Sequence, residues 1–124
     1  MTNSATLLKP LDASLLRILE QEAQTRKSQN LLKYYRPYTK QKEFHHQLVR
    51  ERLLMAGNQL GKTVAGAYEM AFHLTGLYPD WWQGHRFTKE IAAWAGSVST
   101  LATRDTVQRL VCGRPGKLGT GAVP

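Results

Sequence analysis

The chain has little cysteine, little acidic charge and no long apolar run. Its single thiol, Cys112, excludes an internal disulfide, and a zinc site built on cysteines would need more thiols. No apolar run approaches the roughly 20 residues that a membrane-spanning helix requires. The first residues lack the basic segment and the apolar core of a secretory signal. We therefore expect a protein of a reducing, intracellular compartment with no membrane segment.

The shortage of acidic residues makes the 124-residue chain basic. Seventeen lysines and arginines oppose nine aspartates and glutamates, which gives a net charge of +8. A basic balance of this size favours polyanionic partners such as nucleic acid or nucleotides. The 42% of hydrophobic and 21% of charged residues are typical of an ordinary globular chain of one domain.

Hydrophobic periodicity divides the chain into residues 1–30, an N-terminal amphipathic helix, and residues 31–124, an α/β segment. The helix can dock a partner or pack on its own domain, and amphipathic helices usually do the latter. In the second segment, two short apolar runs have the composition of buried parallel strands, although periodicity alone does not separate such runs from fragments of helix. The expected strands are 52–56 and 91–96, and the expected helices are 39–48, 62–74 and 99–111.

The helix expected at 99–111 changes its apolar face between Leu101-Ala102 and Val107-Leu110-Val111, so it is either buried on two sides or broken midway. Ser99 or Thr100 can cap its start. After it, Gly113–Leu118 predicts a surface turn. We expect the loop that carries Trp81 and Trp82 to pack against the sheet, because tryptophan is highly buried on average.

Between the first expected strand and helix 62–74 lies Ala56-Gly57-Asn58-Gln59-Leu60-Gly61-Lys62-Thr63, a Walker A motif with alanine at the first, usually glycine, position. In such a loop, backbone N–H groups and the positive end of the following helix converge on phosphates. Gly61 permits close backbone approach, Lys62 reaches the β- and γ-phosphates, and the Thr63 hydroxyl ligates Mg²⁺. The alternative is a glycine-containing loop with an incidental lysine. The motif predicts a partial P-loop NTPase fold, a parallel sheet flanked by helices.

Four segments together resemble the large terminase subunit of tailed double-stranded DNA phages: residues 37–45, 55–63, 74–82 and 103–113. The similarity spans roughly residues 33 to 124. It implies an N-terminal ATPase domain that drives DNA into a preformed capsid and a C-terminal nuclease domain that cuts the concatemer. It further implies ATP and Mg²⁺ as cofactors and double-stranded DNA, the terminase small subunit and the capsid portal as partners. A homo-oligomeric motor in the bacterial host cytoplasm, transiently at the procapsid portal, is implied as well.

A glutamine upstream of Walker A reads adenine in many such motors, and the resemblance gives this role to Gln41. A side-chain amide can pair with N6 and N7 of adenine, and Tyr38 or Phe44 could add an apolar or stacking contact. The alternative is a solvent-facing glutamine beside two core aromatics. Gln47 is a competing candidate whose spacing fits the family pattern less well.

The sequence also departs from the family. Several terminases carry an arginine in the loop where this chain has Asn58, so no arginine finger is assigned. The carboxylates after Thr63 are Glu69, Asp80, Glu90 and Asp105, and none of them follows an apolar run of four residues, as a Walker B strand requires. The acidic cluster of the nuclease is absent too. We expect the first part of a terminase, truncated after about two strands, that does not turn over ATP alone.

Two other functions stay open at this stage. A different P-loop motor, such as a helicase fragment, would share Lys62 and Thr63 but would not explain the flanking segments. A basic nucleic-acid-binding module would use the charge without nucleotide chemistry. The four histidines show no ligand spacing, so no metal site is predicted beyond the Mg²⁺ that accompanies the nucleotide.

Overall fold

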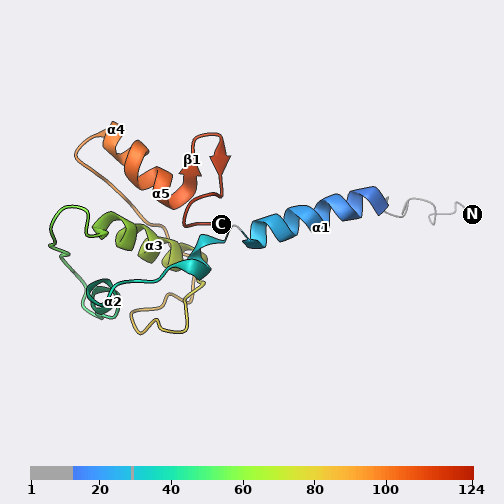
Figure 1. Cartoon of the computed structure of the whole chain (residues 1–124). Coiled ribbons are helices and arrows are strands. Elements are labelled where there is room, and N and C mark those ends of the chain that lie inside the picture. Colours follow the sequence, from blue (N-terminus) through green and yellow to red (C-terminus); the bar gives the residue numbers. More distant parts are fainter. Residues whose placement is uncertain (1–12, 29) are drawn as a thin grey trace, which may run out of the picture.

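The computed structural model describes residues 13–28 and 30–124. Leu11 and Asp12, the expected start and cap of the first helix, lie outside the described residues. Short helices dominate the described part (Figure 1). In chain order the elements are helix α1 (Ala13–Ser28), 3-10 helix η1 (Leu31–Tyr34), helices α2 (Thr39–His45), α3 (Lys62–Thr75) and α4 (Thr100–Ala102), π-helix η2 (Thr103–Gln108), helix α5 (Arg109–Cys112), and strands β1 (Gly113–Arg114) and β2 (Lys117–Leu118).

Helix α3 is the element on which most others pack, since α2, η1, η2 and α5 all contact it. Its bounds confirm the helix predicted at 62–74. Gly61 precedes its first turn, and Gly76 ends it in a left-handed conformation with its N–H donated to the carbonyl of Phe72. Buried residues occur at 65, 67, 69, 71 and 72, more than one narrow stripe can hold, so α3 is covered on two sides.

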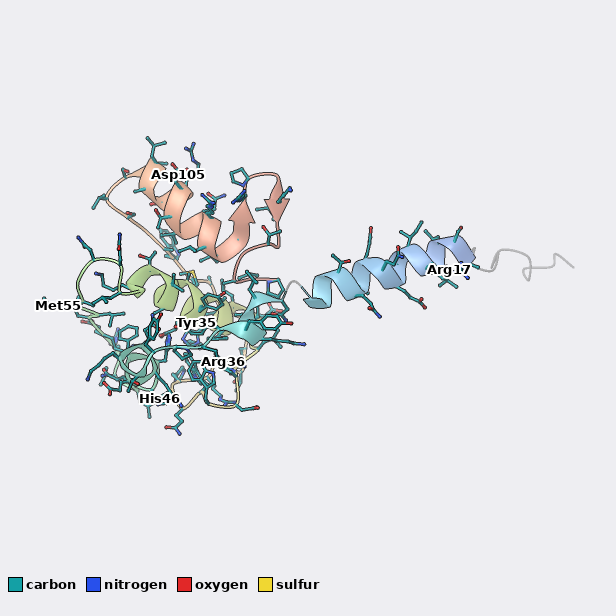
Figure 2. All side chains as sticks on the ribbon, viewed as in Figure 1. Arg17, Tyr35, Arg36, His46, Met55 and Asp105 are labelled. Carbon is teal, nitrogen blue, oxygen red and sulfur yellow. The ribbon has the colours of Figure 1, made fainter. Side chains whose placement is uncertain are left out.

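An aromatic core fills the space beside α3. Tyr35 stacks on Tyr68 with ring centroids 4.2 Å apart, and Phe72 meets Trp82 edge to face at 5.5 Å. Trp82 is 3% exposed and the half-buried Trp81 packs against the same cluster, so this loop packs on the aromatic core beside α3 and not on a parallel sheet. Figure 2 shows the side chain of Tyr35 within this part of the molecule.

The segment from Thr100 to Cys112 is a continuous helix with a π-helical middle, η2. The hydroxyl of Ser99 caps it by accepting the N–H of Ala102 at 3.2 Å. Ala102 and Val107 are both half-buried although they stand five residues apart. Two residues at this spacing lie on the same face of a π-helical turn but not of an α-helical one. The change of apolar face therefore comes from the wider turn, and the helix does not break.

The turn predicted at Gly113–Leu118 is present as a two-stranded antiparallel hairpin that pairs Gly113 with Leu118. Pro115 followed by Gly116 at φ 78° is typical of a type II turn. After the hairpin, the chain returns to the end of α5. There the N–H of Ala122 donates to the carbonyl of Leu110 at 2.7 Å, and the side chain of Ala122 enters the core.

The predicted parallel sheet is wrong for the described residues. Their one sheet is the hairpin β1–β2, and both expected strands, 52–56 and 91–96, are irregular. No backbone hydrogen bond joins these two segments, and Leu53, Met55 and Trp94 are each more than 80% exposed. Buried parallel strands need a hydrogen-bonded neighbour and cover on both faces, which an apolar sequence cannot supply by itself. The described fold is thus a helical one with a small antiparallel sheet.

Helix α1, which carries Arg17, extends away from the other elements (Figures 1 and 2). All its described side chains, residues 13–25, are exposed, so this helix does not bury its stripe on its own domain. Leu15, Leu16, Ile18 and Leu19 are 44–52% exposed. Among the described residues, no helix has both the length and the apolar character needed to cross a bilayer.

A buried carboxylate on α3 ties three segments together. Glu69 is 6% exposed, and its Oε2 accepts a hydrogen bond from Nδ1 of His45 in α2 at 2.7 Å. Its Oε1 pairs with the guanidinium of Arg52 and lies 3.6 Å from Nε2 of His73. The hydroxyl of Tyr35 is 3.0 Å from the other ring nitrogen of His45. The described buried polar side chains are all hydrogen-bonded.

Burial alone would raise the pKa of the Glu69 carboxyl. Contacts with His45, His73 and Arg52, together with the charge of Arg52, outweigh burial and lower this pKa from 4.5 to about 2. Burial, and then the negative charge of Glu69, raises the pKa of Tyr35 to about 12. The carboxylate therefore adds stability that is complete above pH 4.5 and is lost as the pH falls towards 2.

We expect Glu69→Gln to lower the free energy of unfolding by about 3–5 kcal/mol at pH 7, because it leaves the guanidinium of Arg52 without its buried counter-charge. Urea denaturation at a series of pH values measures this. The difference in the free energy of unfolding between the variant and the wild type should shrink as the pH falls from 4.5 towards 2. Glu43→Gln, which removes the exposed pair with Lys40, should change stability by less than about 1 kcal/mol. A Glu69 effect that is constant down to pH 2 would contradict the assignment.

Candidate nucleotide-binding loop

The Walker A segment is an irregular loop that leads directly into α3. Residues 57–60 are exposed, and Gln59 and Gly61 have left-handed backbone conformations with φ of 61° and 74°. Gly61 is the residue immediately before the helix. A 14-residue helix presents free N–H groups and the positive end of its dipole at this point. The loop and helix are therefore arranged as an anion site requires.

Lys62 turns back over the loop. Its Nζ donates to the carbonyl oxygens of Ala56 and Gly57, the latter at 2.6 Å. Lys62 is also one of the residues 58–64 that line a cavity of about 410 Å³. Thr63 is exposed in the first turn of α3, beside Lys62. The structure thus places Lys62 and Thr63 beside the loop and next to a space open to solvent, and their phosphate and Mg²⁺ roles stay predictions.

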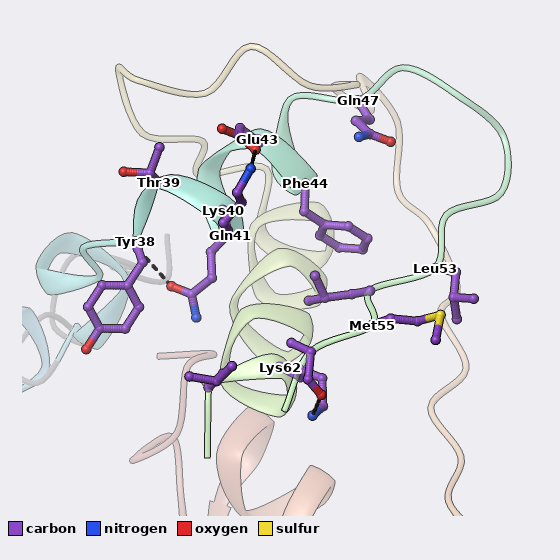
Figure 3. A pocket seen from close by; sticks show the side chains of 13 residues that line it. Tyr38, Thr39, Lys40, Gln41, Glu43, Phe44, Gln47, Leu53, Met55 and Lys62 are labelled. Carbon is purple, nitrogen blue, oxygen red and sulfur yellow. Dashed lines mark hydrogen bonds and ion pairs between the residues drawn. The ribbon is translucent and has the colours of Figure 1, made fainter. Parts of the chain in front are cut away.

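The side chain of Gln41 reaches Gly61 from helix α2 and is 6% exposed. Its Oε1 accepts the backbone N–H of Tyr38 at 2.8 Å, and its Nε2 donates to the carbonyl of Gly61 at 3.0 Å (Figure 3). The solvent-facing alternative is therefore wrong. The adenine-reading role of Gln41 stays a prediction, and the structure shows that both polar atoms of its amide already have partners in the protein.

A second cavity of about 690 Å³ opens between α2 and the segment that precedes the loop. Figure 3 shows Gln41, Phe44 and Lys62 facing this space, with Met55 and Leu53 on the opposite wall. Its lining includes Tyr38 and Gln47, both expected near a base. Tyr38 is 75% exposed, while Phe44 is half-buried beneath the guanidinium of Arg52 at 4.6 Å from its ring centroid.

Sequence reasoning missed Arg52, which anchors the segment before the loop. Its guanidinium donates to the carbonyl of Phe44 at 2.9 Å, at the end of α2, and pairs with Glu69 on α3. A signal was present in the sequence, since Glu69 falls on a helical face between Ala65 and Phe72 and a carboxylate there requires a cationic partner. Among the described residues, no group of three potential ligands is placed to hold a metal ion.

Comparison with known proteins identifies relatives of the chain. A model of the family described as "Terminase large subunit, T4likevirus-type, N-terminal" matches residues 53–123, more than half of the chain. The large terminase subunit of Salmonella phage P22 is 40% identical over 128 residues, which cover 89% of this chain and 25% of the relative. The chain therefore spans about a quarter of the length of that relative. No solved structure matches it.

The loop geometry predicts opposite effects for two glycine-to-alanine changes. At Gly61, a Cβ would strain the left-handed backbone and stand 2.6 Å from Nε2 of Gln41, so Gly61→Ala should destabilise the fold by about 1–3 kcal/mol. Gly66 lies inside α3, where a Cβ would meet no atom within 4 Å, so Gly66→Ala should stabilise the fold by about 0.5–1 kcal/mol. Urea unfolding of both variants measures the sign of the change in the free energy of unfolding. Equal effects would show that the left-handed turn is not required.

Proposed function

Because the chain belongs to the family of large terminase subunits, we propose that it supplies an ATP- and Mg²⁺-binding site to a machine that packages double-stranded DNA into a capsid. Membership confirms the resemblance carried by the four segments named above. The nucleotide would lie at residues 57–63, with its phosphates over the N-terminus of α3.

One observation carries this proposal: the ammonium of Lys62 is held against the Walker A loop by the carbonyl oxygens of Ala56 and Gly57. These carbonyls do not remove the positive charge, and a phosphate chain would offer stronger, charge-assisted acceptors within reach. The left-handed Gly61 leads the chain into α3, whose first turn has backbone N–H groups without acceptors inside the helix.

The residues at the loop also fit the magnesium ion that accompanies a nucleotide. Mg²⁺ in such sites is bound through one or two protein oxygens together with phosphate oxygens and water. The hydroxyl of Thr63, exposed in the first turn of α3, would provide the protein ligand. When bound, the ion would neutralise charge on the β- and γ-phosphates, while Lys62 would hold the phosphate chain against the loop.

The further partners are part of the same proposal. Double-stranded DNA suits the net charge of +8, and the terminase small subunit, the capsid portal and further copies of the chain are the partners of a packaging motor. The place of action would be the host cytoplasm, at the portal of the procapsid. A helicase-like motor would share the loop, and a basic module without nucleotide chemistry would not need it; ATP binding separates this last alternative from the other two.

We expect Lys62→Ala to weaken ATP binding by about 1.5–3 kcal/mol, because a charge-assisted contact to phosphate is lost. Titration of a fluorescent ATP analogue in the presence of Mg²⁺ measures the affinity of both forms. The exposed Lys89 provides a matched control, since Lys89→Ala removes the same charge away from the loop. Equal affinities of wild type and Lys62→Ala would exclude the loop as the phosphate site.

We expect the chain to bind duplex DNA weakly, without sequence preference, and with an affinity that falls steeply as salt is added. Neutralising phosphates releases condensed counterions, which makes the logarithm of the binding constant decline linearly with the logarithm of the salt concentration. Gel-shift titrations on two unrelated duplexes from about 50 to 200 mM salt, a range over which such a decline is measurable, test this. Absence of binding at low salt would argue against DNA as a direct partner of these residues.

A further inference from the structure

We infer that Gln41 is a positioning residue for the phosphate-binding loop, joining the start of α2 to the carbonyl of Gly61. The inference rests on the proposed nucleotide site and assigns to Gln41 a task other than reading the base. It starts from the two hydrogen bonds of the buried amide, 2.8 Å to Tyr38 and 3.0 Å to Gly61.

Gln41 shares the carbonyl of Gly61 with the first turn of α3. The oxygen of Gly61 also accepts the N–H of Ala65 at 2.9 Å, which is the first hydrogen bond of α3. A carbonyl oxygen has two lone pairs, so Gln41 and Ala65 together satisfy both. The peptide that joins the loop to the helix is therefore fixed from two sides, by α3 and by the side chain from α2.

The oxygen of the same side-chain amide caps the start of α2. Oε1 of Gln41 accepts the N–H of Tyr38, which precedes α2 and has no partner inside that helix. Gln41 occupies the third position of α2, where Glu or Gln is typical of a capping box. The amide is thereby held in one orientation, with its nitrogen directed at Gly61.

The contact between Gln41 and Gly61 leaves no room for a side chain at residue 61. A Cβ on residue 61 would lie 2.6 Å from Nε2 of Gln41, so the contact exists only because this residue is glycine. Gln41 is 6% exposed. The buried amide thus uses one acceptor site and one N–H on the backbone at the two ends of the contact. Holding the loop is the role that needs no rearrangement of these bonds.

The test uses the 124-residue chain and the variant Gln41→Glu. A carboxylate in this position keeps an oxygen for the N–H of Tyr38, and with it the cap of α2, but loses the donor to Gly61. Lys40→Gln is the matched control, because it lowers the net charge by the same single unit at the neighbouring, exposed position of α2. Gln41→Met, which adds no charge, provides a second variant.

Three ligands are titrated with Mg²⁺: ATP, GTP and inorganic tripolyphosphate, which has no base. We expect both Gln41 variants to weaken all three by the same factor, about three- to tenfold, the worth of one hydrogen bond. The ratio of ATP to GTP affinity should not change, and Lys40→Gln should stay within about twofold of wild type for each ligand.

Amide hydrogen exchange in the free protein provides a measurement that does not depend on nucleotide. The N–H of Ala65 should exchange about three- to tenfold faster in the Gln41 variants, because its acceptor is no longer fixed. If the wild type bound none of the three ligands, the proposed function would fail, and the exchange of Ala65 would still decide whether Gln41 holds the loop.

Three results would overturn the positioning role. One is a loss confined to ATP, which would make Gln41 the adenine reader. Another is a lower free energy of unfolding with unchanged affinity for tripolyphosphate, which would make it a purely structural residue. The third is unaltered exchange at Ala65 in both variants.

Discussion

The carboxylate of Glu69 constrains the arrangement of everything around the loop. It is removed from water in the middle of α3, and a charge in that position must keep its partners. Those partners come from the end of α2, from the segment before the loop and from the next turn of α3, namely His45, Arg52 and His73. Tyr35 extends the contacts to the aromatic core through His45. The requirement to compensate one charge thus fixes the relative positions of η1, α2 and α3.

The same constraint gives the loop two fixed ends. Arg52 and Glu69 stand 17 residues apart in sequence, and the whole Walker A segment lies between them. At the far end of the segment, Gln41 holds the carbonyl of Gly61. Residues 57–60, between the two anchors, remain exposed. A loop whose ends are fixed loses less conformational entropy when it closes on a ligand, which is the physical advantage of preorganisation.

Local signals in the sequence predicted local structure well. Helical spacing predicted α3 at 62–74, and the segment Gly113–Leu118 predicted a turn that proved to be a hairpin. The loop of Trp81 and Trp82 was expected to pack inward, and it does, with Trp82 in the core and Trp81 packed against it. Each of these features depends on a few neighbouring residues, so no knowledge of the rest of the fold was needed.

Features that depend on distant partners were not predictable in the same way. The runs 52–56 and 91–96 have the composition of strands, but a strand also needs a neighbour, and composition does not say whether one is present. The contact of Gln41 with Gly61 spans 20 residues, and that of His45 with Glu69 spans 24. The π turn at Thr103–Gln108 was visible only as a change of apolar face, which two other arrangements explained equally well.

The contacts also bear on where the structural unit around the Walker A segment begins. The family match starts at residue 53, whereas Gln41, His45 and Arg52 all precede it. Each of these three side chains nevertheless bonds to a residue inside the matched range, either Gly61 or Glu69. Without residues 38–52, Glu69 would lose two of its partners and Gly61 would lose its second hydrogen bond. The structural unit that holds the loop therefore includes α2 and Arg52, in agreement with the P22 relative, whose similarity extends over 89% of the chain.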